Sequence, residues 1–369
     1  MFDIVGTKSL DSNAVDFVEH GINFVGRTFE NNGIQGKIKK QKFEPNEPFT
    51  ITATVIGNYK YVKYQKEPYY CSQNINKLTP KPIFIKWSEK IAIFLMTNIW
   101  RFVSMYDGQQ GGYKLDDIKN HKIKLPITAS GEIDFEFMES FVAELEAERV
   151  AELEAYLAAA SLKDYELTAA ELSALSKFEN YNWGEFRIGD LFEKLSAKFL
   201  GKGDKFKAVS KIKTTEFFVP IVYCKFGDNG IMYWAKKNDF ETYKNVISIV
   251  YNGAIAAGKV YAQPHETGIL AESYFIKFKN REIDFKVNLF FQCVLEKVLY
   301  PKYSRDYLAT WDNKVENDVI SLPITDNDEI DFEFMNNFIK AIEKLVIKDV
   351  VLYADNKIKA TKSIVSSNQ

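Results

Sequence analysis

The chain has 369 residues, of which 46% are hydrophobic and 27% charged, and its net charge is −2. This length predicts two or three domains of about 150 residues each. The cysteines Cys71, Cys224 and Cys293 have no paired spacing, which argues against disulfides or a zinc site and predicts buried thiols in a reducing cytoplasm. The longest apolar run, 91–96, is too short to span a membrane, and the N-terminus has no export-signal layout, so no membrane partner is expected.

One sequence pattern occurs twice at a constant offset. Residues 125–128 (LPIT) precede EIDFEFM at 132–138, and the same two strings recur 197 residues later. The tripeptide Asn-Gly-Ile at 32–34 also recurs at this offset. A constant spacing over about a hundred residues predicts two copies of one domain, each ending in the same strand-to-helix junction.

Charge is segregated along the chain. Residues 131–165 hold ten acidic and two basic side chains, whereas 194–213 hold seven lysines and one aspartate. Residues 33–66 likewise hold seven lysines and two glutamates. Acidic helices beside basic lobes would direct a polyanion onto the lobes, although lysines that merely solvate loops give the same pattern.

In chain order, each copy is predicted to be a β-rich lobe followed by a helix. The β-branched runs 49–56 and 245–251 stop at Gly57-Asn58 and Asn252-Gly253, and both return through Lys- and Tyr-containing segments, which predicts hairpins. The apolar stretches 94–100 and 288–299 are helix or strand, and the sequence leaves both open. Segments 106–113 and 300–305 are predicted to be loops.

Each lobe ends in a predicted long helix with Asp134 or Asp331 as its N-cap. Apolar side chains three and four residues apart predict a helix seam in which the two helices pack antiparallel. About 30 helical residues span roughly 45 Å, more than the roughly 34 Å of one duplex turn. The helix seam consists of Met138, Phe141 and Leu145 in the first helix and Met335, Phe338, Ile342 and Leu345 in the second.

The segment 183–192 (WGEFRIGDLF), together with the repeated order of lobe and long helix, resembles the DNA specificity subunit of type I restriction-modification systems. The DFEFM helix start also resembles specificity subunits of type IIB (BcgI-like) systems, whose methylase and nuclease share one polypeptide. The resemblance implies two target-recognition domains that each read half of a bipartite, asymmetric double-stranded DNA site. It also implies helices that set the spacing and bind methyltransferase subunits, and possibly a restriction subunit.

The predicted fold class is therefore α+β, with two β-rich target-recognition domains joined and spaced by two long antiparallel helices. The first lobe starts at Phe2, which aligns with Phe192, so its opening segment is expected to be missing. The expected domains are a first target-recognition domain at 1–130, a spacer helix and linker at 131–180, a second target-recognition domain at 181–326, a second spacer helix at 327–353 and a polar tail at 354–369.

Catalysis by this chain is not expected. An adenine methyltransferase needs an Asn/Asp-Pro-Pro-aromatic loop and a glycine-rich turn for its methyl donor, and the sequence contains neither. Nuclease-like Asp-x-Lys tripeptides begin at Asp284, Asp312 and Asp355, but a highly charged chain contains such tripeptides by chance. The leading hypothesis is a noncatalytic DNA-binding subunit without cofactor or metal. The alternative is a tandem β-rich module that binds protein or another ligand.

Candidate DNA contacts are amide and cationic side chains near the basic segments. Gln can pair in bidentate fashion with adenine and Arg with guanine, whereas Lys contacts phosphates. The alternative for Asn32 and Asn229, each next to a glycine, is that they only shape turns. The candidates are Arg27, Asn32, Lys60, Gln109 and Gln110 in the first lobe, and Lys225, Asn229, Lys259, Lys302 and Arg305 in the second.

Overall fold

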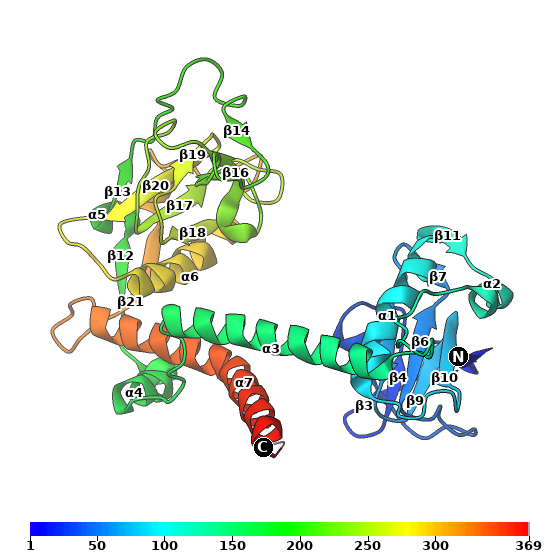
Figure 1. Ribbon diagram of the computed structural model, residues 1–369. Helices are drawn as coiled ribbons and strands as arrows, with labels where there is room; N and C mark the ends of the chain where they lie inside the picture. Colours follow the sequence, from blue (N-terminus) through cyan, green and yellow to red (C-terminus); the bar gives the residue numbers. More distant parts are fainter. Residues whose placement is uncertain (368–369) are drawn as a thin grey trace. The chain divides into compact units, whose positions relative to one another are not determined.

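The computed structural model describes residues 1–367, and side chains through residue 359 (Figure 1). It divides into unit 1, which is Met1–Tyr156 with the last helix from Asn356 onward, and unit 2, which is Leu157–Asp355. Within residues 1–367 no helix combines the length and the hydropathy that a membrane span requires.

The elements that begin in unit 1 are mostly strands. They are β1 (Phe2–Gly6), β2 (Ser9–Leu10), β3 (Phe17–Val18), β4 (Ile22–Val25), the 3-10 turn η1 (Asn31–Gly33), β5 (Ile34–Ile38), β6 (Thr50–Thr54), β7 (Ile56–Gly57), β8 (Val62–Gln65), β9 (Tyr69–Ser72), β10 (Ile75–Pro80), α1 (Glu89–Ser104), β11 (Gly108–Gly112), α2 (Leu115–Asn120) and α3 (Phe135–Ala159).

Unit 2 opens with a short helix and closes with the longest one. Its elements are α4 (Ala169–Lys177), η2 (Phe178–Asn180), β12 (Trp183–Arg187), α5 (Ile188–Leu191), β13 (Phe192–Leu195), β14 (Val209–Ser210), β15 (Val219–Val222), η3 (Asp228–Gly230), β16 (Ile231–Ala235), β17 (Val246–Val250), β18 (Val260–Gln263), β19 (Gly268–Ile269), β20 (Ser273–Phe278), α6 (Phe285–Lys302), η4 (Val315–Asn317), β21 (Val319–Pro323) and α7 (Phe332–Ser367).

In unit 1, α1 packs on a four-stranded antiparallel sheet of order β1-β10-β6-β8. Ile51 and Leu78 from the sheet meet Ile99 and Phe102 from the helix in a buried core. Burying each such side chain stabilises the unit by about 1.5–3 kcal/mol. A five-stranded sheet of order β2-β9-β4-β5-β3 continues the lobe.

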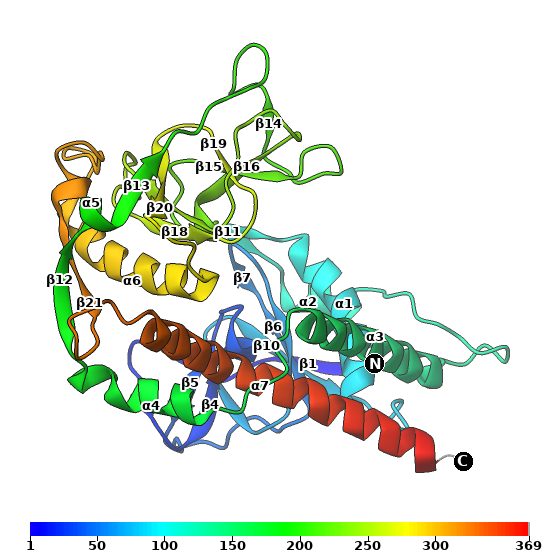
Figure 2. The same ribbon diagram turned by 90° about the vertical axis from the view of Figure 1, so that its left-hand side faces the viewer.

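In unit 2, α6 packs in the same way on a four-stranded sheet of order β13-β20-β17-β18, and Figure 2 shows this helix beside β18. Ile247, Ile249 and Ile276 meet Phe291 and Leu295 in the core. Ahead of β13, strand β12 pairs with β21, and α5 follows it. A further sheet of order β14-β16-β15-β19 extends the lobe.

Both predicted hairpins are confirmed, and the two undecided apolar stretches are helices. Strand β6 pairs antiparallel with β8, and β17 with β18. Helix α1 starts at the N-cap Ser88, whose hydroxyl accepts a hydrogen bond from the amide of Ile91, and α6 starts at the N-cap Asp284. Buried residues then recur every three or four positions on both helices, which is the helical period.

The two predicted loops are partly wrong. Within 106–113, Gly108–Gly112 forms β11, which pairs with β7 through an irregular register. Within 300–305, residues 300–302 are the end of α6, and Pro301 lies in its last turn, where it cannot donate a hydrogen bond to the carbonyl of Lys297. Only the residues from Tyr303 onward form a turn.

The strand-to-helix junctions have the same geometry in both units, and the predicted N-caps are confirmed. The carboxylate of Asp134 accepts a hydrogen bond from the amide of Phe137 at 2.8 Å, and that of Asp331 accepts one from the amide of Phe334 at 2.8 Å. An isolated β-bridge closes the preceding turn in each unit, Ile127 with Ile133 and Ile324 with Ile330. The residues expected to form a separate polar tail continue α7 as far as Ser367.

The structure places the two methionines of the predicted helix seam inside the lobes. Met138 is fully buried against Phe84, Ile91 and Leu95 of its own unit, and Met335 is fully buried in the core of unit 2. These methionines therefore fix each helix to its lobe and are unavailable for contact between helices. The first turn of a helix that follows directly from the lobe presents its apolar side to that lobe.

Phe338 also packs within unit 2, because its ring stacks on that of Phe178 with the centroids 4.4 Å apart. The other predicted seam residues, Phe141 and Leu145 on α3 and Ile342 and Leu345 on α7, are exposed. Their exposed apolar side chains leave a stripe on each helix beyond its anchored first turn.

The linker 160–181 is bound to α7 within unit 2. The ammonium of Lys344 lies 2.8 Å from the carboxylate of Asp164 and 3.1 Å from that of Glu171. Glu171 also closes a capping box with Thr168 at the start of α4. Because Glu171 is buried, this ion cluster is shielded from water on one side and holds the linker in place.

Removing the Lys344 ammonium should destabilise unit 2 only in a defined pH window. Burial by itself would raise the pKa of the Glu171 carboxyl, but hydrogen bonds from the Thr168 amide and from Lys344 outweigh it and hold that pKa below its usual range. A lowered pKa stabilises the folded state above the unfolded value of about 4.3, and this stabilisation is lost as the pH falls through the folded pKa.

Lys344→Ala should therefore cost about 2 kcal/mol of unfolding free energy at pH 7, with the difference from the unmodified protein disappearing under acid. Hydrogen bonding to Asp164 raises the pKa of Lys344, so the difference should also shrink at strongly alkaline pH. Denaturant unfolding from pH 3 to pH 8 measures the acid limb, and Lys348→Ala, an exposed lysine one turn further on, is the control. A constant difference across this range would contradict the role of Glu171.

Candidate nucleic-acid interface

Each unit carries the same tight turn between two strands of its lobe. In unit 1 the turn is η1, with Asn32 at φ 53°, and in unit 2 it is η3, with Asn229 at φ 54°. Asparagine tolerates this left-handed conformation better than most residues because its short side chain can bond to nearby backbone. Gly33 and Gly230 follow at φ 81° and 73°, where a side chain would be strained.

A buried amide fixes each turn to the sheet below. In unit 1 the Asn32 side chain donates to the carbonyl of Tyr64 at 2.7 Å, and buried Gln65 donates to the carbonyl of Asn32 and to the hydroxyl of Thr52. In unit 2 the corresponding bonds run from Asn229 to the carbonyl of Ala262, and from buried Gln263 to the carbonyl of Asn229 and the hydroxyl of Ser248.

This network favours the turn-shaping alternative for Asn32 and Asn229, because each side-chain amide donates to the backbone below and holds the turn. Base contact by the two asparagines stays a prediction. The buried partners Gln65 and Gln263 were missed, because a glutamine inside a β-rich run has no local signal of burial. Their hydrogen bonds hold the turns rigidly and so fix the positions of the neighbouring residues.

Lys60 is corrected, because it is 1% exposed and its ammonium does not face solvent. The ammonium donates to the carbonyls of Tyr106 and Gly57, and the Lys60 amide donates to the carboxylate of Asp107 at 2.8 Å. These bonds attach the start of the β11 hairpin to the β7–β8 loop. The structure therefore gives Lys60 a positioning role toward Gln109 and Gln110, in place of a phosphate contact.

Lys60→Ala should act on stability first. The substitution leaves two carbonyls without their donor and opens a cavity, which should lower the unfolding free energy of unit 1 by about 2–3 kcal/mol. Thermal denaturation measures this loss, with the exposed Lys37→Ala as a control that should leave stability unchanged. A flatter salt dependence of DNA binding without loss of stability would instead place the Lys60 ammonium against phosphate.

The three predicted lysines of unit 2 lie within ion pairs. Lys225 pairs with Asp228 at 2.5 Å, Lys259 pairs with Glu296 at 2.6 Å, and Lys302 pairs with Asp318. Lys259 is the most enclosed of these lysines, since its side chain is largely buried, whereas Lys302 stays exposed. A lysine whose charge is paired with a carboxylate attracts phosphate less strongly than an unpaired one. These lysines are therefore weaker candidates for phosphate contact than their charge alone suggests.

Four predicted residues remain exposed in positions suited to contact. Gln109 and Gln110 lie on β11, the strand that the Lys60 bonds hold in place. Arg305 lies at the tip of a tight turn closed by hydrogen bonds between Ser304 and Tyr307, and Arg27 is exposed on the loop before η1. The structure shows their exposure, and base contact by any of them stays a prediction.

The loop 196–218 of unit 2 presents the basic run found in the sequence. Its exposed lysines lie between β13 and β15, with few acidic neighbours in the loop itself. Long flexible lysines of this kind suit phosphates, since they need no fixed geometry. These lysines are Lys198, Lys202, Lys207, Lys211 and Lys213.

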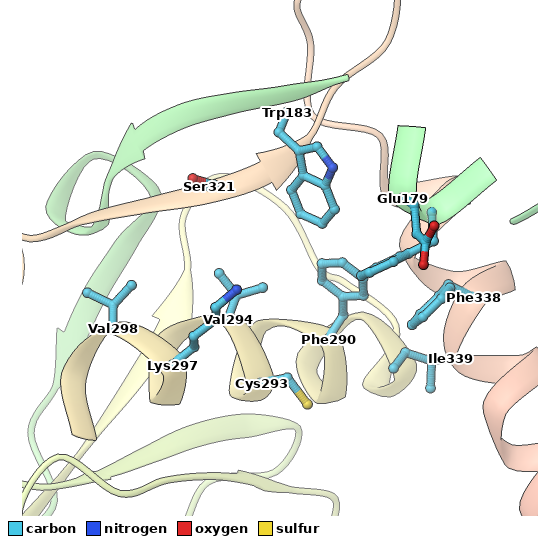
Figure 3. A pocket seen from close by; sticks show the side chains of 11 residues that line it. Glu179, Trp183, Phe290, Cys293, Val294, Lys297, Val298, Ser321, Phe338 and Ile339 are labelled. Carbon is cyan, nitrogen blue, oxygen red and sulfur yellow. The ribbon is translucent and has the colours of Figure 1, made fainter. Parts of the chain in front are cut away.

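An apolar cavity of about 590 Å³ lies elsewhere in unit 2, between α6, η2, β12 and α7 (Figure 3). Trp183 and Phe290 face each other across it, and Phe338 lies beside Phe290. Its few polar side chains include Glu179 and Lys297. The lining suits packing of carbon atoms and offers little for reading a base edge.

The cysteine prediction is confirmed for Cys71 and wrong for Cys293. Cys71 is buried in unit 1, and this burial raises the pKa of its thiol to about 12. Cys224 is half-buried, while Cys293 is exposed on α6 beside the apolar cavity. Within residues 1–367 no cluster of His, Cys, Asp or Glu side chains could hold a metal ion.

The structure contains two β-rich lobes, each followed by an anchored helix. Each lobe has a rigid turn and exposed polar or basic loops, which is typical of a protein that recognises another molecule through its loops. The family model of the type I restriction modification DNA specificity domain matches residues 1–155 and 180–352, and the chain belongs to this family. It is thus a specificity subunit of the restriction-modification class, whose members recognise DNA sequence and as a family are noncatalytic.

Among curated proteins, the chain is similar to the specificity subunit S.BcgI of a type II restriction enzyme from Heyndrickxia coagulans. The two are 22% identical over 355 residues, which cover 94% of this chain and 93% of that protein. Among solved structures, it is similar to the type I restriction-modification S subunit from M. genitalium, with a TM-score of 0.60 at 15% identity, covering 99% of this chain and 92% of the other. At this identity the structural likeness supports the fold alone.

Proposed function

We propose that this chain recognises a bipartite, asymmetric DNA site, with one half read by each unit, and directs methyltransferase partner subunits to it. The observation that carries the proposal is the recurrence of one rigid turn, built on Asn32 and Asn229, within lobes whose other exposed loops differ. Two lobes that share this turn but differ in their exposed contact residues are suited to two half-sites of different sequence. The two units would be copies of one domain, as the constant offset predicts.

The target-recognition domains would be residues 1–130 and 181–326, and the spacer helices would be residues 131–180, with the linker, and 327–353. The exposed apolar stripe of Phe141 and Leu145 on α3 and that of Ile342 and Leu345 on α7 would pack antiparallel and set the distance between half-sites. Methyltransferase subunits, and possibly a restriction subunit, would bind the helices and supply catalysis.

Methylation profiling tests the proposal as a whole. DNA from cells that express the chain with its methyltransferase partner should carry methyl groups at a two-part, non-palindromic motif, and this motif should be absent from cells that lack the chain. The purified chain alone should neither methylate nor cut DNA. Methylation at an unchanged motif in cells without the chain would reject the proposal.

The alternative, a tandem module that binds protein, is distinguished by salt. A protein that displaces counterions from several phosphates loses about 10³–10⁵ in affinity between 50 and 200 mM salt, whereas an apolar protein interface changes little. Titration of the purified chain with duplex DNA at several salt concentrations therefore separates the two. The exposed lysines of loop 196–218 favour the DNA hypothesis.

The exposed reading loops should act on separate half-sites. Arg305→Ala should cost about 1–3 kcal/mol of binding free energy on targets with an intact second half-site, and should leave discrimination within the first half-site unchanged. Gln109→Ala should do the reverse, because β11 belongs to unit 1. Competition binding with duplexes altered in one half at a time measures both effects. If both variants keep the affinity and the preferred sequence of the unmodified protein, these loops do not read bases.

A further inference from the structure

An exposed phenylalanine stands at the same place beside both asparagine turns. Phe29 and Phe226 are 197 residues apart, and each precedes its turn asparagine by three residues. Phe29 is 67% exposed and Phe226 is 50% exposed. Neither belongs to the buried apolar clusters of its unit.

In unit 1 the ring of Phe29 is held by one lysine and one tyrosine. The ammonium of Lys63 lies 4.5 Å from the ring centroid and also donates to the Phe29 carbonyl at 3.0 Å. The ring of Tyr61 lies 5.6 Å away, centroid to centroid. These contacts fix the orientation of the Phe29 ring and leave most of it open to solvent.

In unit 2 the ring of Phe226 has the same kinds of neighbour, supplied from different positions. The ammonium of Lys259 lies 4.5 Å from the Phe226 centroid and 4.4 Å from that of Tyr300, and the two rings are 6.3 Å apart. Lys259 comes from the hairpin loop and Tyr300 from the end of α6. The same three residue types thus surround the ring in both units, although the tyrosine comes from the β8 hairpin in unit 1 and from the end of α6 in unit 2.

The asparagine turns hold the two phenylalanines in fixed positions on the surface. Gly33 donates its amide to the carbonyl of Glu30, and Gly230 donates its amide to that of Gly227, so the loops that carry the rings are closed in the same way. Buried Gln65 and Gln263 hold the turns to the sheets. A rigid aromatic side chain beside a cation has the chemistry of a contact to a nucleic acid base, with the ring on the base and the charge near a phosphate.

We propose that Phe29 and Phe226 are base-stacking contacts, each of which lies against a base at a partly unstacked step of the half-site that its own unit reads. The inference rests on the proposed function and adds a class of contact that hydrogen-bonding side chains do not provide. Lys63 and Lys259 keep each ring in place, and Lys63 adds positive charge beside its ring, whereas the charge of Lys259 is paired with Glu296. The stacking depends on the aromatic face, so any aromatic side chain should preserve it and alanine should remove it.

The experiment uses the full chain with its methyltransferase partner and the duplex identified by methylation profiling. 2-Aminopurine, whose fluorescence rises when it unstacks, replaces one base at a time across each half-site. The unmodified complex should give raised fluorescence at one step in each half. Phe29→Ala should abolish the signal in the first half only and weaken binding on the order of 10- to 100-fold, and Phe226→Ala should do the same in the second half.

The controls separate stacking from folding. Phe29→Trp and Phe226→Trp should retain most of the affinity, and Ile85→Ala, at a site 94% exposed in unit 1, should behave like the unmodified protein. Thermal denaturation should give the same midpoint for all variants, because the rings are outside the cores. Each alanine variant serves as the control for the other half-site.

Two results overturn the inference while leaving the proposed function intact. One is unchanged affinity and fluorescence in both alanine variants, together with normal discrimination of the target by the unmodified complex. The other is normal DNA binding with loss of methyltransferase binding, which would make the rings a protein contact. If the unmodified complex does not distinguish the target from an unrelated duplex, the proposed function fails, and the inference fails with it.

Discussion

Met335→Asp is expected to cost several kcal/mol of unfolding free energy in unit 2, and Met138→Asp the same in unit 1, because each methionine is fully buried and a carboxylate there would have no partner. The exposed seam position Phe141 should respond differently. Phe141 is 42% exposed, so Phe141→Asp should lose its ring contacts with Phe94 and Phe137 but leave its charge in water, and the cost to unit 1 should be much smaller.

Differential scanning calorimetry and near-UV circular dichroism measure these losses. The informative comparison is Met138→Asp with Phe141→Asp, since the residues are three positions apart on one helix. If α3 also packs against α7, Phe141→Asp should alter the recognised spacing or partner binding without unfolding the lobe. Equal destabilisation by both substitutions would contradict the distinction between a buried Met138 and an exposed Phe141, and would support one helix seam that contains both residues.

Lengthening both spacer helices by seven residues is expected to move the preferred gap between half-sites by about 10 Å, or roughly three base pairs, because an α-helix rises 1.5 Å per residue. A heptad is the right insertion because it returns the apolar stripe to nearly the same side of the helix. On α3 the insertion belongs beyond Leu145, and on α7 beyond Leu345, so that the anchored first turns keep their contacts.

Methylation profiling of cells that express the lengthened chain gives the new gap directly. The two half-site sequences should not change, since the lobes are untouched. Lengthening only one helix is the control, and it should reduce methylation overall because the apolar stripes no longer match along their length. An unchanged gap after both insertions would show that the helices do not set the spacing.

Features that depend on neighbouring residues could be predicted from the sequence. The hairpin of β6 and β8, that of β17 and β18, and the N-caps Asp134 and Asp331 follow from β-branched runs, turn residues and capping chemistry, all of which act over a few positions. The family resemblance also came from short strings repeated at a fixed offset. The antiparallel pairing of α3 with α7 stays a prediction.

Which side chains of a given type are free to act depends on contacts that form only in the folded chain. Lys60 appears basic and available in the sequence, but the carbonyl of Tyr106, 46 residues away, accepts from its ammonium and buries it. Asn229 is likewise committed to the carbonyl of Ala262, 33 residues away. Met138 points into its lobe because Ile91 and Leu95 of α1 lie there. Burial depends on partners distant in the chain, and local pattern cannot encode them.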